Sequence, residues 1–240
     1  RCAADALRDR PIPDLDPATL ATAMMPSLTT PLGPLTDNRD LSAIAAGDRL
    51  TELDFELPLA GGDHPRSPVS VADLAGCLSD HLPTDDDLGA YPDHLTTDPF
   101  TGQRLVGFLA GSIDAVLRVG TPARPRFLVA DYKTNWIGGS LSRRILHAQD
   151  YNRAAMADAM MAAHYPLQAL LYQVALHRYL RWRMPDYDPA THLGGVLYLF
   201  VRGMCGADTE VDGDSPYGVF DWRPPPALIA DVSDLLRGRS

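Results

Sequence analysis

The chain has 240 residues, of which 45% are hydrophobic, so it can bury a full core and is most simply one domain. Its formal net charge of −10 at pH 7 disfavours a free-standing protein that finds nucleic acid through its own field, because such proteins are usually basic. A domain to which DNA is delivered by other parts of an assembly escapes that objection, and so does an acidic enzyme that acts on a small molecule.

No apolar run approaches the roughly 20 residues that span a bilayer, so we expect no membrane partner. The first residues have neither an initiator Met nor the layout of a signal peptide, which indicates a piece of a longer protein. Three widely spaced cysteines suggest neither a disulfide framework nor a zinc site. A reducing, cytoplasmic location fits this pattern best.

The first half of the chain reads as helical pieces, a strand, a helix and a loop. Residues 1–47 form a loosely patterned N-terminal helical and loop segment. Strict alternation of apolar and acidic residues predicts a strand over residues 51–58. A helix capped by Ser70 is predicted over residues 71–82, and a surface loop over residues 84–101.

The second half predicts a hairpin, two helices, a strand and a last helix. Apolar runs at residues 105–119 and 126–134 flank a turn-forming stretch and predict the hairpin. Helical residues follow from 151 to 183, and Pro166 opens a new helix within them because it lacks a backbone donor. A continuous apolar strand at 193–201 precedes a helix at 227–236. The fold class is therefore α/β, with a mixed central sheet flanked by helices.

Lys133 is the single lysine among 21 basic residues. It follows Asp131 by two places at the end of an apolar run, so both side chains lie on the same strand face. Arginine cannot replace a compact ammonium that approaches a phosphate or water as a point charge. One interpretation of Asp131 and Lys133 is an ordinary solvated ion pair. The other is a catalytic pair, because charges at the end of a buried core strand are costly unless they are paired.

The hairpin brings a second carboxylate to this pair. If the turn is centred between Pro122 and Ala123, Asp114 lies opposite Asp131. Facing carboxylates repel each other unless a proton or a cation lies between them. Two acidic oxygen donors with positions left for water and phosphate suit Mg²⁺. A nearby ammonium could orient or deprotonate the attacking water, or neutralise charge that grows on phosphorus. A one-residue slip of register would turn Asp114 to the other face.

Five blocks in this order closely resemble the C-terminal nuclease domain of bacterial RecB, the beta subunit of the RecBCD helicase–nuclease (exonuclease V). They are GFLAGSID at 107–114, VADYKTNWIG at 129–138, YPLQALLY at 165–172, ALHRYL at 175–180 and HLGGVLYLFVRG at 192–203. The resemblance covers roughly residues 48 to 236. It implies the restriction-endonuclease-like fold of the PD-(D/E)xK nuclease superfamily for a domain at 48–240.

The resemblance also implies residue roles. Asp114 and Asp131 would bind the metal, the backbone carbonyl of Tyr132 would add a ligand, and Lys133 would be the catalytic lysine. Glu52 matches an acidic residue on the preceding strand of the superfamily, where it would support metal or water. A solvent-facing acidic strand is the alternative for Glu52.

Gln168 and Tyr172 match the Gln-x-x-x-Tyr motif of this family. They lie four positions apart, hence on one helix face, and could touch DNA or brace the site, or simply pack. Trp136 and Trp182 could stack on bases, although tryptophan packs more often than it binds. One feature departs from the family: RecB-type nucleases use a metal-binding histidine upstream of the Glu52 strand. No histidine here precedes His64.

The sequence thus predicts a Mg²⁺-dependent exodeoxyribonuclease domain that acts in double-strand break repair and recombination. Its expected partners are DNA, RecC-like and RecD-like subunits, and the helicase domain of the same parent chain. The main alternative is a non-catalytic nuclease fold that docks partner subunits and regulates the motor. A hydrolase of small phosphoesters is a weaker alternative, because the chain has no phosphate-binding glycine loop.

Overall fold

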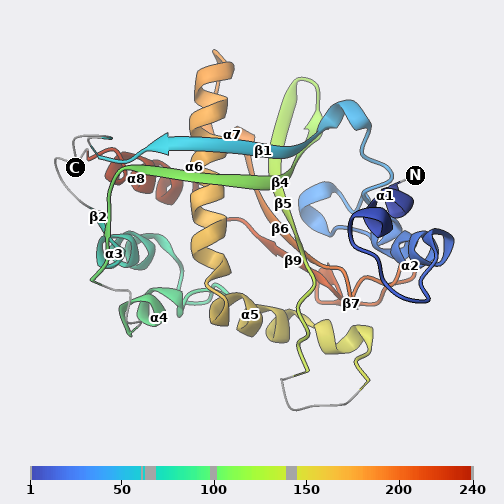
Figure 1. The fold of residues 1–240 in the computed structure, drawn as a ribbon. Helices are drawn as coiled ribbons and strands as arrows, with labels where there is room; N and C mark the ends of the chain where they lie inside the picture. Colours follow the sequence, from blue (N-terminus) through green and yellow to red (C-terminus); the bar gives the residue numbers. More distant parts are fainter. Residues whose placement is uncertain (1, 61, 63–68, 98–101, 139–144, 239–240) are drawn as a thin grey trace.

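A computed structural model describes residues 2–60, 62, 69–97, 102–138 and 145–238 (Figure 1). The helices are α1 (Cys2–Asp9), α2 (Pro17–Thr29), α3 (Val71–His81), α4 (Tyr91–Thr97), α5 (Arg153–Ala162), α6 (Tyr165–Arg183), α7 (Pro189–His192) and α8 (Pro226–Leu235), with short 3₁₀ turns η1 (Pro34–Thr36), η2 (Ala46–Asp48) and η3 (Ala148–Tyr151). The strands are β1 (Arg49–Pro58), β2 (Val69–Ser70), β3 (Arg104–Leu105), β4 (Phe108–Thr121), β5 (Arg124–Lys133), β6 (Leu193–Phe200), β7 (Val211–Asp212), β8 (Ser215–Pro216) and β9 (Val219–Trp222).

A five-stranded sheet forms the centre, in the order β1-β4-β5-β6-β9. Strands β1, β4 and β5 are antiparallel neighbours, β5 and β6 are parallel, and β9 returns antiparallel to β6. Helices α5 and α6 supply the long connection that a parallel pair requires. The predicted mixed α/β architecture is confirmed.

The hairpin register is the one that the sequence predicts. Thr121 pairs with Arg124 across the turn, and the pairing continues in step to Ala115 and Ala130. The printed pairs end there, and the same register continued by one residue would set Asp114 opposite Asp131. Up to Ala115 and Ala130 no slip of register occurs.

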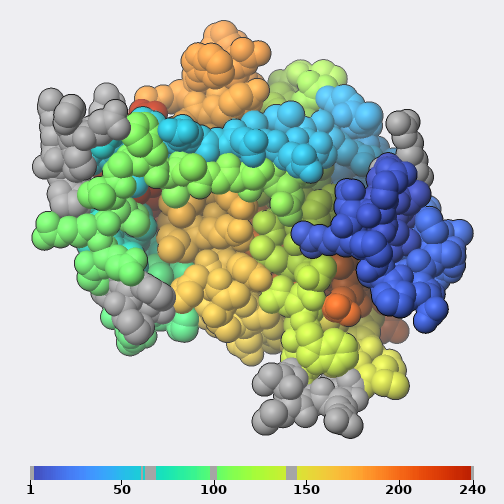
Figure 2. Space-filling model, viewed as in Figure 1, coloured from blue at the N-terminus to red at the C-terminus, as the bar shows by residue number. Residues whose placement is uncertain are grey.

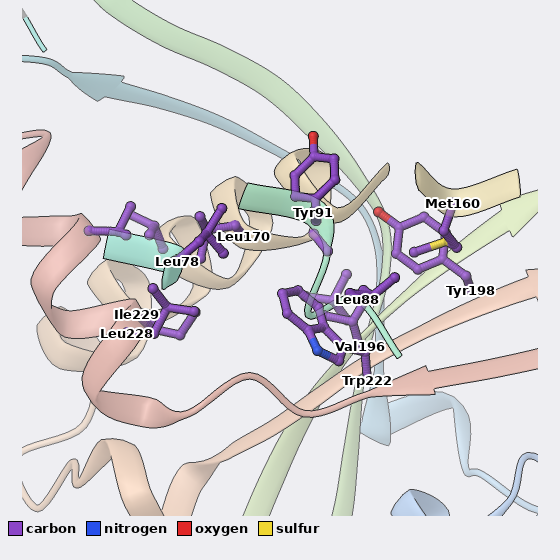
Figure 3. Packing of buried hydrophobic residues seen from close by; sticks show 14 of the residues in the cluster. Leu78, Leu88, Tyr91, Met160, Leu170, Val196, Tyr198, Trp222, Leu228 and Ile229 are labelled. Carbon is purple, nitrogen blue, oxygen red and sulfur yellow. The ribbon is translucent and has the colours of Figure 1, made fainter. Parts of the chain in front are cut away.

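The larger part of the core lies between one face of the sheet and helices α3, α4, α5, α6 and α8. Ser70 caps α3 in a reciprocal capping box with Asp73, and Pro166 lies in the first turn of α6, both as predicted. Figure 3 shows Leu78, Leu170 and Ile229 packed together, one from each of α3, α6 and α8. Burial of these apolar side chains, each worth about 1.5–3 kcal/mol, anchors α6 across the sheet.

The N-terminal segment covers part of the opposite face. Leu32, Leu41 and Ile44 are almost fully buried there, in a second cluster with Leu128 of β5 and Leu197 of β6. In Figure 2 this segment, in blue, covers the end of the molecule beside β1. Strands β5 and β6 are thus buried on both faces, which explains why their apolar runs are continuous rather than alternating.

Two sequence predictions differ from the structure. Residues 84–101 were expected to form a loop, but α4 lies within them, and residues 98–101 are outside the described part of the chain. This short helix depends on tertiary packing, because Tyr91 and Leu95 are buried against the core. Strand β9 was not predicted, because its four residues are too few to show an alternation of apolar and polar side chains. None of the helices in the described ranges is both long and apolar enough to cross a membrane.

Candidate active site

Asp131 and Lys133 lie at the end of β5, on the face that α6 covers. Strand alternation places them in line with Val129, which belongs to the core beneath α6. Lys133 Nζ lies 2.6 Å from Asp131 Oδ2, and their side chains are only 12% and 4% exposed. The pair is therefore not the solvated ion pair that was the alternative for this sequence.

The hydrogen bonds around the buried Asp131 carboxylate do not satisfy both of its oxygen atoms. Among the side chains that the structure describes, its Oδ2 is the one buried polar atom without a well-directed hydrogen bond. Burial raises the pKa of Asp131 above its ordinary value, the Lys133 ammonium opposes that rise, and the neighbouring Asp114 carboxylate adds to it. A buried oxygen in this state is suited to accept a further cation.

Two tyrosine rings hold the Lys133 ammonium. The Tyr165 ring, from the first turn of α6, has its centroid 3.9 Å from Nζ, and the Tyr198 ring centroid lies 5.2 Å away. The two rings stack with centroids 5.6 Å apart. Tyr198 comes from β6, where it pairs directly with Asp131 in the parallel register. Cation–π contact and strand pairing together fix where the amine sits.

Gln168 and Tyr172 complete the support from α6, one turn apart on the same helix face. Lys133 Nζ donates a hydrogen bond of 3.1 Å to Gln168 Oε1, and Gln168 Nε2 donates one of 3.0 Å to the Tyr172 hydroxyl. The Tyr198 hydroxyl also lies 3.1 Å from Gln168 Oε1. Burial raises the pKa of Tyr172, and the Asp131 carboxylate adds to that rise. Both residues of the predicted pair thus contact the site.

Asp114 lies on β4 beside this cluster. Its Oδ2 accepts a 3.0 Å hydrogen bond from the backbone N–H of Tyr132, which ties the end of β4 to the end of β5. Strand alternation puts the Tyr132 side chain on the opposite face of β5 from Asp131, and it is 43% exposed. Asp114 and the Tyr132 backbone are therefore adjacent, as the hairpin arithmetic requires.

Glu52 occupies an unusual point of β1. Thr51 pairs with Ala115 and Leu53 with Ile113, so Glu52 is opposite Asp114, yet that one pair is skipped in the ladder. Glu52 has φ of +53°, a left-handed conformation that is uncommon for a side chain such as this. Its side chain is exposed. Three acids therefore occupy adjacent positions on β1, β4 and β5, but Glu52 does not share the buried environment of Asp131.

The oxygen atoms of the Asp131 and Asp114 carboxylates are suitable ligands for a hard divalent cation. Asp131 Oδ2 lacks a well-directed donor, Asp114 is its neighbour, and the Tyr132 carbonyl could supply a third oxygen. Mg²⁺ usually keeps several waters and takes only one or two carboxylates, so this number of ligands suffices. No group of three or more His, Cys, Asp or Glu side chains in the described ranges is arranged to hold a metal.

Sequence reasoning missed Tyr165 and Tyr198. Both lie within the quoted blocks, but neither was assigned a role at the site. A signal was present for Tyr165, which precedes Gln168 by three positions and so shares its helix face. No comparable signal marks Tyr198, because its neighbour Asp131 comes from a strand that is distant in sequence.

Comparison with named proteins gives consistent similarity to one subunit. The chain is 55% identical over 223 residues to the RecB subunit of the RecBCD enzyme of Mycobacterium tuberculosis, and 51% identical over 224 residues to that of Mycolicibacterium smegmatis. It is 36% identical over 199 residues to that of Escherichia coli. These matches cover 92%, 93% and 82% of this chain, but only 20%, 20% and 14% of the relatives.

The chain thus spans about a fifth of the length of the two mycobacterial relatives. No protein-family model matches it. The resemblance to RecB that the sequence blocks indicated is confirmed over nearly the whole chain.

Proposed function

Because this chain is homologous to RecB across nearly its whole length, we propose that it is the nuclease domain of a RecB-like helicase–nuclease subunit. In this role it is a Mg²⁺-dependent exodeoxyribonuclease that hydrolyses phosphodiester bonds during double-strand break repair and homologous recombination. The assignment to the PD-(D/E)xK superfamily, made from the Asp114 and Asp131-Tyr-Lys133 motif, is part of this proposal.

One observation carries the proposal. The buried Asp131 carboxylate has an oxygen without a well-directed hydrogen bond, 2.6 Å from the single lysine of the chain and beside a second carboxylate. A buried ion pair that leaves one carboxylate oxygen without a well-directed hydrogen bond adds little to stability, so such an arrangement in a fold usually serves a site.

Each residue of the candidate site has its own proposed role in phosphodiester hydrolysis. A bound Mg²⁺ would supply charge neutralisation at the phosphate and a more acidic water. Asp131 and Asp114 would hold the cation through their carboxylate oxygens, and the Tyr132 carbonyl would add a ligand. Lys133 stands at the same carboxylate, so its ammonium either orients the attacking water or stabilises the charge that develops on the phosphoryl oxygens. Gln168 and the Tyr165 ring keep that amine in place.

The proposed partners follow from charge and from the relatives. A chain of net charge −10 attracts DNA poorly by its own field, so we infer that a helicase domain of the parent chain delivers the substrate. RecC-like and RecD-like subunits would complete the assembly, since the relatives are named as subunits of the RecBCD enzyme.

The test is the Lys133→Ala variant in the complete subunit assembly, on linear DNA with Mg²⁺. General acid–base or electrostatic help from one side chain contributes about 10²–10⁴-fold, so we expect cleavage to fall by at least about 100-fold while unwinding persists. The matched control is Arg124→Ala, which removes an exposed cation from the opposite end of β5. Cleavage by Lys133→Ala at the wild-type rate would remove the catalytic assignment.

A non-catalytic scaffold that docks subunits and regulates the motor is the second candidate. It is favoured by the position of Glu52, whose exposed side chain does not share the buried environment of Asp131. It predicts that Lys133→Ala changes unwinding or assembly and that the wild-type domain shows no cleavage above an EDTA blank. The same experiment therefore separates the two candidates.

A further inference from the structure

A groove near the candidate site is lined by an exposed tryptophan and a row of alanines. It has a volume of about 490 Å³ and lies between residues 135–137 and the outer face of α5. Figure 2 shows α5, in gold, beside the yellow-green segment that follows β5, at the lower edge of the molecule. We propose that this groove, the Trp136 groove, receives a nucleobase of single-stranded DNA that stacks on Trp136. The inference deepens the proposed nuclease function and rests on it.

The walls of the groove suit a flat, apolar ligand. Trp136 is 47% exposed at one side, and four alanines of α5 and its end form the other side. They are Ala155, Ala159, Ala162 and Ala163. The volume lies within the usual range for small-molecule sites, about 300–1,000 Å³. An exposed indole facing a wall of methyl groups offers a stacking platform that every base can use, whatever its sequence.

The Trp136 segment is held in place rather than loosely exposed. The Tyr165 hydroxyl donates to Asn135 Oδ1 at 3.2 Å, and the Tyr151 hydroxyl donates to the Asn135 carbonyl at 2.9 Å. Gly138 permits the indole to pack closely, because a Cβ at that position would lie 2.8 Å from Trp136 Nε1. A platform fixed before binding loses less entropy when a ligand stacks on it.

Polar groups at the rim match the edge of a base. Asn135 and Asp158 both line the groove. Within the described ranges, the Asn135 side-chain amide donates no hydrogen bond and the exposed Asp158 carboxylate has no partner. One amide donor and one carboxylate acceptor complement the mixed donors and acceptors on a base edge. Asp158 would repel a phosphate, so the groove suits the base and not the backbone.

The groove is linked to the proposed catalytic centre through the chain and through Tyr165. Trp136 follows Lys133 by three residues, a chain reach of about 10 Å. The same Tyr165 whose ring holds the Lys133 ammonium donates its hydroxyl to Asn135 at the groove. A strand whose phosphate lies at Asp131 and Lys133 can therefore place a nearby base against Trp136.

Trp182 lacks this placement although it is 76% exposed. It lies near the end of α6, about four turns and roughly 21 Å beyond Gln168. Its ring contacts Tyr179 and the Arg183 guanidinium instead. It therefore provides a matched control, a second exposed tryptophan outside the groove.

The test measures anisotropy of fluorescein-labelled oligothymidylate of about 12 nucleotides, within the usual site size, in EDTA so that no cleavage occurs. An abasic oligonucleotide of equal length keeps the phosphates and removes the bases. We expect the wild-type chain to prefer the oligothymidylate, and Trp136→Ala to weaken that binding by about 5- to 160-fold, the range for one stacked base. Binding of the abasic probe should not change.

Further variants distinguish loss of base stacking from loss of the folded structure. Ala162→Leu fills the groove from an exposed helical position and should weaken oligothymidylate binding as well. Trp136→Phe should keep most of the affinity, and Trp182→Ala all of it. The inference fails if the wild type binds both probes equally, if Trp136→Ala and Ala162→Leu bind as the wild type does, or if they lose both probes alike.

Cleavage assays keep this outcome separate from the nuclease proposal. If Lys133→Ala abolishes cleavage while the groove variants bind normally, the groove inference alone is wrong. If Lys133→Ala cleaves as the wild type does while the groove variants lose base-dependent binding, the nuclease proposal is wrong and the groove binds single strands for another purpose.

Discussion

Two partly buried ion pairs in this chain are built in opposite ways. Arg153, at the start of α5, donates to Asp221 at 2.7 Å, to Ser215 at 3.1 Å and to Asp87 at 2.8 Å, and its guanidinium lies over the Phe220 ring. Burial acts to lower the pKa of Arg153, but the two carboxylates outweigh it and the pKa is raised.

The pair of Lys133 and Asp131 shows the opposite balance. Here burial outweighs the partner and raises the pKa of the acid, and one carboxylate oxygen is left without a well-directed donor. A network in which every polar atom has a hydrogen-bond partner stabilises the packing of the helices and strands that it joins. A network with an unsatisfied oxygen at the end of a core strand can still bind a ligand there. The difference marks Asp131 and Lys133 as a candidate functional pair on grounds that are independent of sequence motifs.

The largest expected effect comes from replacing the acid of each pair by its neutral isostere. Asp221→Asn should lower the free energy of unfolding by about 2 kcal/mol, because Arg153 loses a charged hydrogen-bond partner. Asp131→Asn should lower it by less, about 1 kcal/mol, because Lys133 loses its partner but the variant also removes a carboxylate that burial disfavours, and Gln168 and the Tyr165 ring still hold the ammonium. Urea denaturation of both variants in EDTA measures the two values.

Equal losses of stability in the two variants would mean that Asp131 is a structural charge like Asp221. The comparison between the pairs would then no longer separate function from structure.

A smaller effect should follow from changing the ring that holds Lys133. Tyr165→Leu removes a cation–π contact of about 0.5–2 kcal/mol, so we expect kcat for DNA cleavage to fall about tenfold with KM little changed. Tyr165→Phe keeps the ring and should stay within about threefold of wild type. If Phe and Leu are equally impaired, the hydroxyl bond to Asn135 matters and the ring does not.

The smallest effect concerns pH. Because burial raises the folded-state pKa of Asp131 above its ordinary value of 3.8, its carboxylate costs stability at neutral pH. That cost disappears as the pH falls through the raised pKa, since the folded protein then takes up the proton more readily than the unfolded chain. The stability of Asp131→Asn relative to wild type should therefore decrease between neutral pH and the ordinary pKa.

Unfolding in EDTA at several pH values measures this trend. A relative stability that grows as the pH falls would mean that Lys133 compensates Asp131 fully in the folded state.

Much of the sheet was predictable because its patterns are local. The turn chemistry around Pro122 sets the register that brings Asp114 opposite Asp131, and Pro166 sets the start of α6. Gln168 and Tyr172 share a helix face by spacing alone. Short elements were less predictable: α4 and β9 have too few residues for a period, and packing decides them.

The sequence by itself determined the hairpin, its two carboxylates and the lysine beside Asp131, because residue spacing and turn position fix neighbours along one β-ribbon. Only the tertiary structure decided what surrounds that lysine. Tyr198 arrives from β6 through a parallel pairing, and Tyr165 arrives from α6, which packs over the sheet through its buried leucines. Such contacts between distant segments depend on how apolar faces are buried together, and no local pattern encodes them.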